Sequence, residues 1–391
     1  MSYIVTEVRT LAELKKELED TDNINNRLEC RIMNDLDFNE EGFWYHPDPP
    51  YFFDINMARN NLQVPESYDP NHRYYLIDGG KYEEDPITHA QVLVGNNALT
   101  NIYTYPNSVV FKQHGNDQYH LAGGITIKNL DFEAVLNQSC MFVFKEGPAY
   151  GPLVFENCNF NLKIIGYPKN NIEGSGANPP IFFFSCSGTI GSGRSGHLRF
   201  VNCTFNVEIT GSPERKFGGL FDADGTLSYS DISASVIADA CEFRIKNMTN
   251  DCSFSLFGNG ETLPTQRNTG SKANFYINNC AFFLNNYKPV NNNNIYIPFH
   301  NNTSSYRNTI MNSFFAAFAE TADATIDSDY RSIIKFKDDY ATAVFYDSDR
   351  LVQQWFSASA ERGEAHYALT TAECKSESKL REIGFLFATE S

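Results

Sequence analysis

The stretch Phe155–Phe160 reads FENCNF, and it decides the fold because similar stretches recur along the chain. The cysteine, the second phenylalanine and the leucine that follows alternate with polar residues, as in a half-buried β-strand. The alternation slips by one residue at Asn157, and asparagine tolerates the left-handed backbone of a tight corner better than most residues. The stretch therefore predicts two strands that meet at a corner.

The recurrence of this stretch indicates a repeat architecture. Related stretches lie at 127–132, 200–205, 237–243, 276–282 and 310–315, and each is followed by a second apolar phrase, at 142–144, 182–184, 219–221, 255–257, 297–299 and 334–336. The intervals are unequal, which predicts a constant strand frame carrying loops of variable length. Stacked coils of this kind bring equivalent residues into columns.

Three kinds of residue are expected to form such columns. They are the cysteines Cys158, Cys203, Cys241 and Cys280, the phenylalanines Phe160, Phe205, Phe243 and Phe282, and the corner asparagines Asn157, Asn202 and Asn279. We interpret the cysteines as reduced core residues, because a small apolar side chain suits a crowded interior position. We predict no metal site and no cofactor, since the eight histidines lack the spacing of zinc ligands.

The fold expected from this repeat is all-β, a right-handed single-stranded parallel β-helix. A leucine-rich repeat would need leucine and helix-forming spacings that are missing, and a propeller would need four strands in each repeat. We divide the chain into an N-terminal cap helix and first strand (1–40), first coils with a long aromatic and proline-rich insertion (41–124), regular coils (125–340) and a C-terminal capping region (341–391).

Both ends of the chain carry helical patterns that are expected to cap the core. At the N-terminus, Thr10–Leu18 places leucines at helical spacing behind a capping box, and Cys30–Phe38 alternates as a first strand. At the C-terminus, Asp349–Phe356 and Leu369–Phe385 have helix-like patterns, and the second is closed by a glycine. We therefore expect an N-terminal helical cap and an α-containing C-terminal cap.

The N-terminal order of elements resembles that of pectate-lyase-like β-helix proteins. It consists of a short helix, the phrase NDLDF at Asn34–Phe38, the turn at Ile77–Gly79 and then the coils. The tail at Leu369–Phe385 is similar to the ending of signal-less β-helix proteins of phages, prophages and gut bacteria. The resemblance implies a component of a phage virion, such as a tail spike or fibre, and a possible homotrimer.

Composition narrows the expected partners and location of the protein. The chain has 391 residues and a formal net charge of −17, which argues against nucleic acid because phosphate binding needs clustered basic residues. The first residues lack a signal peptide, and no segment approaches a membrane span. We expect a protein made in the host cytoplasm and placed in a virion, or one that stays cytoplasmic or is released by lysis.

Candidate functional residues are few. Asp222 and Asp224 end a strand phrase and are the best pair of carboxylates for acid and base chemistry, with Glu214, His197 and Arg215 as possible neighbours, while Trp44, Tyr45 and Tyr51 are candidate sugar-stacking residues. The leading hypothesis is a non-enzymatic structural or receptor-binding virion protein whose partners are other virion proteins and a host surface glycan. The alternatives are a polysaccharide lyase or glycoside hydrolase, and a bacterial surface adhesin.

Overall fold

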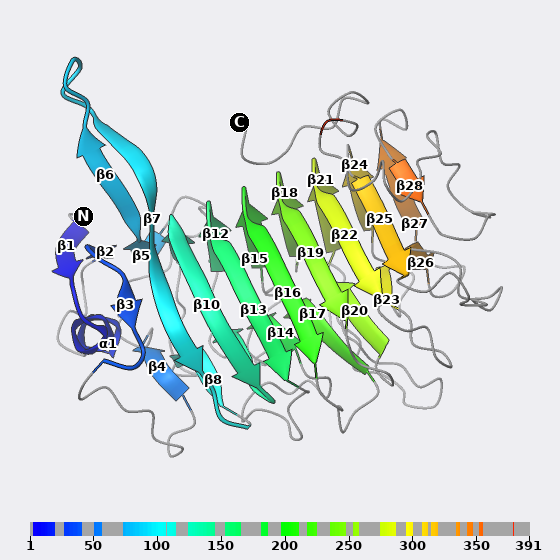
Figure 1. Ribbon diagram of the computed structural model, residues 1–391, viewed down its shortest axis with the longest axis horizontal. Helices are drawn as coiled ribbons and strands as arrows, with labels where there is room; N and C mark the ends of the chain where they lie inside the picture. The colour runs from blue at the N-terminus through cyan, green and yellow to red at the C-terminus, as the bar shows by residue number, and fades with distance from the viewer. Residues whose placement is uncertain are drawn as a thin grey trace, which may run out of the picture.

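The described part of the protein is built almost entirely of parallel β-sheet. A computed structural model of the chain describes residues 3–19, 27–40, 51–56, 73–106, 108–114, 124–144, 153–165, 181–186, 197–210, 217–224, 235–247, 253–257, 274–286, 295–299, 307–311, 314–319, 334–336, 342–346, 352–354 and 378. These ranges contain three large sheets and one α-helix, α1 (Leu11–Glu19) (Figure 1). No helix within them is long and apolar enough to cross a membrane.

Each sheet is a row of strands drawn from the whole length of the chain. The first sheet contains, in spatial order, β1 (Tyr3–Val8), β2 (Arg27–Ile32), β5 (Arg73–Asp78), β9 (Gly124–Lys128), β12 (Leu153–Glu156), β15 (His197–Val201), β18 (Ser235–Asp239), β21 (Asn274–Asn278), β24 (Arg307–Met311) and β27 (Thr342–Tyr346). The second contains β3 (Leu36–Asp37), β7 (Gln91–Tyr103), β10 (Leu130–Asn137), β13 (Asn159–Ile165), β16 (Thr204–Thr210), β19 (Glu242–Asn247), β22 (Ala281–Asn286), β25 (Phe314–Ala319) and β28 (Val352–Gln354). The third contains β4 (Tyr51–Asn56), β8 (Val109–His114), β11 (Cys140–Phe144), β14 (Ile181–Cys186), β17 (Phe217–Asp224), β20 (Ser253–Phe257), β23 (Ile295–Phe299) and β26 (Ile334–Phe336).

The chain visits the three sheets in rotation. From β9 in the first sheet it passes to β10 in the second and β11 in the third, and then returns to the first sheet with β12 beside β9. We call each such circuit a coil. Because equivalent strands of successive coils pair in parallel and in phase, each coil lies directly on the preceding one (Figure 1).

The core consists of phenylalanine columns that follow from this register. Phe160, Phe205, Phe243 and Phe282 pair in sequence along the second sheet and are completely buried. Their ring centroids are 4.6 to 4.9 Å apart and the rings are nearly parallel. This spacing equals the distance of about 4.8 Å between neighbouring strands, so the rings stack without distorting the backbone.

The cysteines form a second buried column next to the corners. Cys158, Cys203, Cys241 and Cys280 are reduced cysteines that are no more than 1% exposed. The Sγ atoms of Cys203 and Cys280 lie 3.5 and 3.4 Å from the backbone oxygens of Phe155 and Ala238 in the preceding coil. Burial raises the pKa of the Cys203, Cys241 and Cys280 thiols well above its ordinary value, so these thiols stay protonated at neutral pH.

The asparagines occupy the corner between the first and second sheets. Asn157, Asn202 and Asn279 have φ values of 54°, 51° and 50°, in the left-handed region that asparagine adopts readily. Asn202 donates a hydrogen bond from Nδ2 to Oδ1 of Asn157 at 3.2 Å, and Asn157 donates to Asn129 at 2.8 Å. Ala240 takes the same backbone conformation, with φ 53°, and it interrupts this series of amides.

The N-terminal end of the stack is closed by α1. Leu11, Leu14 and Leu18 bury one face of the helix against the core, and the amide of Glu13 donates to the Thr10 hydroxyl at 3.1 Å. The first strand is β1 and precedes the helix, whereas the sequence indicated a first strand within Cys30–Phe38. That segment instead supplies β2 and β3, which belong to different sheets.

At the other end, strand pairing continues past residue 340 in β27 and β28. The helix expected within Asp349–Phe356 is wrong, because residues 352–354 form a strand that pairs with β25 from Phe314 onward. Pairing with an existing sheet edge satisfies the backbone and overrides the local helical pattern. Of the helix expected over 369–385, only Ser378 is among the described residues. Of the aromatic insertion at 43–53, residues 43–50 lie outside the described residues, and residues 51–53 belong to β4.

A hairpin arm leaves the stack near its N-terminal end. β6 (Gly80–Glu84) pairs antiparallel with the first half of β7, and the two strands project away from the coils (Figure 1). We call residues 80–94 the arm. The sequence suggested only a turn after Asp78, because the repeat pattern contains no unit of this kind.

Asp78 anchors the base of the arm. Its buried carboxylate contacts Lys128 Nζ at 2.9 Å and accepts hydrogen bonds from Asn129 Nδ2 and the Tyr82 hydroxyl, both at 2.9 Å. Burial raises the Asp78 pKa, but the hydrogen bonds from Asn129 and Lys128 outweigh it, so the pKa lies below its usual value. Burial and the bond to Asp78 together raise the pKa of Tyr82 to about 12.

Candidate functional site

The outer face of the second sheet presents mostly polar side chains, at every second position of its strands. Along β10, β13, β16 and β19 the inward residues are buried, and the intervening residues are partly or fully exposed. This is the expected result of strand alternation when one face covers a core. The outward residues are therefore free to carry function, because packing does not determine them.

In-phase pairing arranges these outward residues in two rows that cross the strands. The first row contains Glu133, Asn161, Asn206 and Arg244, and the second contains Val135, Lys163, Glu208 and Lys246. Each step along a row is one strand, or about 4.8 Å. The face thus offers hydrogen-bonding groups at a regular interval along the stack.

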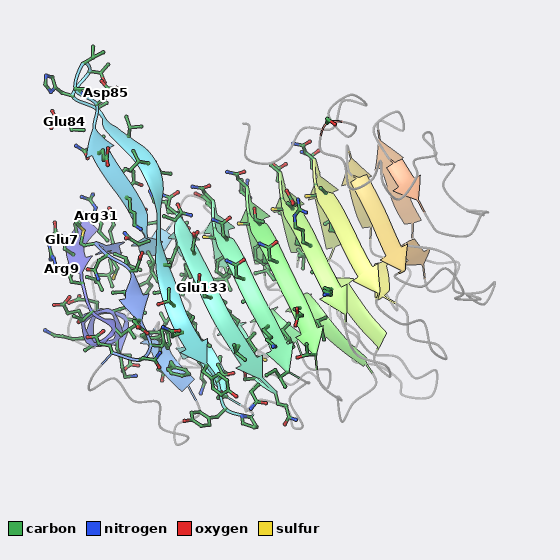
Figure 2. All side chains as sticks on the ribbon, in the orientation of Figure 1. Glu7, Arg9, Arg31, Glu84, Asp85 and Glu133 are labelled. Atoms are coloured by element: carbon green, nitrogen blue, oxygen red, sulfur yellow. The ribbon has the colours of Figure 1, made fainter. Side chains whose placement is uncertain are left out.

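These rows line an open groove with a volume of about 810 Å³. Tyr103 of β7, which pairs with Val135, lies at the N-terminal side of the groove and is 56% exposed. Arg244 and Lys246 line the opposite side. Figure 2 labels Glu133 on β10, the strand next to β7.

The groove combines amides with charges of both signs. Asn206 donates from Nδ2 to Oδ1 of Asn161 at 3.0 Å, which holds the two amides in a fixed orientation across neighbouring strands. Arg244 forms an exposed ion pair with Glu242 on its own strand. Such a surface supplies both donors and acceptors to a polar ligand, and its rigid strands lower the entropy that binding would otherwise cost.

The residues singled out from sequence for catalysis do not belong to this groove. Asp222 and Asp224 lie at alternate positions of β17 in the third sheet, in register with Phe184 and Cys186. His197 begins β15 in the first sheet. The side chains of these three residues, and the whole of Glu214 and Arg215, lie outside the described residues.

The structure also does not describe the side chains of the aromatic residues proposed for sugar stacking. Trp44 and Tyr45 lie outside the described residues, and Tyr51 begins β4 but its side chain is not described. Within the described ranges, no group of three or more His, Cys, Asp or Glu side chains converges as a metal site.

The groove residues were missed by the sequence analysis although a signal for them is present. They occupy the first and third positions after each column phenylalanine, as in Asn161 and Lys163 after Phe160, or Arg244 and Lys246 after Phe243. The missing information was the register, because only in-phase pairing turns these separate pairs into continuous rows. Comparison of the chain with protein-family models, curated proteins and solved structures gives no match.

Proposed function

We propose that the protein is a right-handed, pectate-lyase-like parallel β-helix that binds an extended carbohydrate chain along the outer face of its second sheet, as a surface component of a phage particle. The observation that supports binding is the pair of rows in the groove, which are polar except for Val135. A carbohydrate chain repeats its hydroxyl groups along its length, and the rows repeat donors and acceptors along the stack. Tyr103 adds an exposed aromatic face at one end.

The shape of the groove favours a polymer over a small molecule. The groove crosses several strands and is open to solvent, whereas sites for small ligands enclose most of the ligand surface. A polymer gains affinity from many weak contacts that are spread along a rigid surface. The virion setting rests on the similarity of the C-terminal tail at Leu369–Phe385 to the ending of phage and prophage β-helix proteins.

Binding is tested by retention of bacterial surface polysaccharides on the purified, immobilised protein. Asn206→Ala removes one amide of the first row, and loss of one hydrogen bond of about 1 kcal/mol is expected to weaken binding roughly fivefold. Arg244→Ala tests the opposite side of the groove. Its matched control is Arg199→Ala, because Arg199 is also exposed on a strand, β15, but in the first sheet.

An equal loss in the Arg199 and Arg244 variants would contradict the assignment of the groove as the binding site. No retention of any polysaccharide by the unmodified chain would contradict the proposed function itself. Mass spectrometry of purified phage particles tests the setting, since the chain must be found among the particle proteins.

A polysaccharide-cleaving enzyme is the second candidate, and the position of Asp222 and Asp224 supports it. Alternate positions at the end of one strand lie on the same face of a sheet, where two carboxylates share acid and base roles in glycan cleavage. New reducing or unsaturated ends in the retained polysaccharide would favour this candidate. Their disappearance in the Asp222→Asn variant, with retention unchanged, would separate cleavage in the third sheet from binding in the second.

A further inference from the structure

The arm carries a concentration of exposed apolar side chains. Ile87 is 86% exposed, Val94 54%, Val92 46%, Tyr82 42% and Leu93 38%. Singly exposed apolar residues are common on protein surfaces, but a cluster on one projecting element marks an interaction surface. The arm lies outside the polar groove and has no part in the function proposed above.

The arm is also a ribbon of only two strands where it leaves the stack. β6 pairs with β7 along one edge, and no other strand of the described ranges pairs with its second edge. A two-stranded ribbon is marginally stable in water, and an unpaired edge offers backbone donors and acceptors to another strand. Both properties favour a further strand beside β6.

The sequence of β6 is complementary to itself when two copies run antiparallel. A two-fold pairing centred on Tyr82 places Lys81 of one copy directly opposite Glu83 of the second copy, and it does so twice. Opposite charges at directly opposed positions stabilise a strand pair. The same pairing places Glu84 opposite Gly80, which carries no side chain to oppose it.

This register also joins the apolar residues of the two arms. Tyr82 pairs with Leu93 across the ribbon, so both side chains lie on one face. In the paired arms, one row of side chains would cross all four strands. It would contain, in order, Leu93 and Tyr82 of one copy and then Tyr82 and Leu93 of the second copy. Aromatic and aliphatic neighbours on adjacent strands bury part of their exposed surface against each other.

We propose that the arm is a dimerisation element, in which β6 pairs antiparallel with β6 of a second copy to form a four-stranded sheet. The base of the arm is already held in place for this pairing. Tyr82 donates its hydroxyl to Asp78 at 2.9 Å, and the Gly80 amide donates to the same carboxylate at 3.0 Å. Figure 2 shows Glu84 and Asp85 at the far end of the arm, away from the coils.

Sedimentation of the full chain tests the proposal through a charge reversal. Glu83→Lys places two lysines opposite each other at both symmetric positions, and the dissociation constant of the dimer is expected to rise about tenfold or more. The matched control is Glu84→Lys, which makes the same change in net charge on the same strand but opposite Gly80, and it is expected to leave dimerisation almost unchanged. The double variant Lys81→Glu, Glu83→Lys exchanges the two charges and is expected to restore the dimer, while the exposed contact of Lys81 Nζ with Asp35 in the same chain, at 3.2 Å, is lost.

Cross-linking provides a second measurement that needs no variant. Light and heavy isotope-labelled chains are mixed, and a zero-length reagent joins amines to neighbouring carboxylates. A hybrid light–heavy link between Lys81 and Glu83 is expected from the paired arms, because such a link arises only between copies. A monomeric chain, a trimer, equal weakening by Glu83→Lys and Glu84→Lys, or the absence of the hybrid link would each overturn the proposal.

Discussion

The stacked core and the projecting arm are both β-structure, but they obtain their order from different sources. In the core, Phe205 stacks on Phe160 and Phe243 at 4.6 and 4.9 Å, so each coil is held by the coils on both sides. In the arm, each strand has one partner strand, and order depends on the buried anchor at Asp78 and on the exposed ion pair between Lys81 Nζ and Asp35 at 3.2 Å. Repetition stabilises the core, whereas a single buried contact site fixes the arm.

The largest effect that separates the two regions is expected from truncation of an apolar side chain. Phe205→Ala leaves a cavity between two rings and should lower the free energy of unfolding by about 3–5 kcal/mol. Ile87→Ala on the arm should change it by less than about 0.5 kcal/mol, because Ile87 is exposed. Urea unfolding followed by circular dichroism measures both, and similar losses in the two variants would show that the arm is part of the core.

The next largest loss of stability is expected at Asp78, which anchors the arm. Asp78→Asn removes the charge that Lys128 contacts in a buried site, and should cost about 2 kcal/mol at neutral pH. Because the pKa of Asp78 is lowered in the folded protein, its contribution is complete above the ordinary value of 3.8 and is lost as the pH falls through the lower, folded value. The difference between variant and native chain should therefore shrink in acid, and urea unfolding at a series of pH values checks this. A difference that stays constant with pH would contradict the ionic role of Asp78.

A smaller loss is expected at the corners of the core. Asn202→Ala forces alanine into a left-handed conformation and removes the hydrogen bond to Asn157, so the loss should be about 1–2 kcal/mol. Asn206→Ala serves as a control for stability, because Asn206 is exposed on a regular strand. Equal denaturation midpoints for the two variants would argue against a structural role for the corner amides.

The smallest expected effect is a gain in stability. Ala240 has φ 53° where the neighbouring coils have asparagine, so Ala240→Asn should relieve backbone strain and raise the free energy of unfolding by about 0.5–1 kcal/mol. A rise in the thermal midpoint would support this. Destabilisation would mean that the corner has no room for the amide, and that alanine is required there for packing.

The repeated positions of the core could be predicted from sequence because the same pattern of residues recurs in successive coils. Cys158, Phe160 and Asn157 gain their meaning from their counterparts in other coils, so one register explains all of them. The arm appears once, and its alternation in Tyr82–Glu84 is too short to distinguish a hairpin from a turn. The groove could not be predicted because its residues come from different coils. Lys163 and Lys246 are seen to lie in one row only when the pairing of β13, β16 and β19 is known.

The in-phase register of the coils has a consequence for how such a protein changes over generations. Each coil contacts only the coils before and after it, so duplication of one whole coil would lengthen the stack and leave every other contact unchanged. Deletion of a whole coil would shorten it in the same way. Gain or loss of a single residue within a strand such as β13 would instead turn Phe160 toward solvent and bury Asn161 in the core. Length should therefore vary in steps of a coil or in the connecting loops, while the strands keep their number of residues.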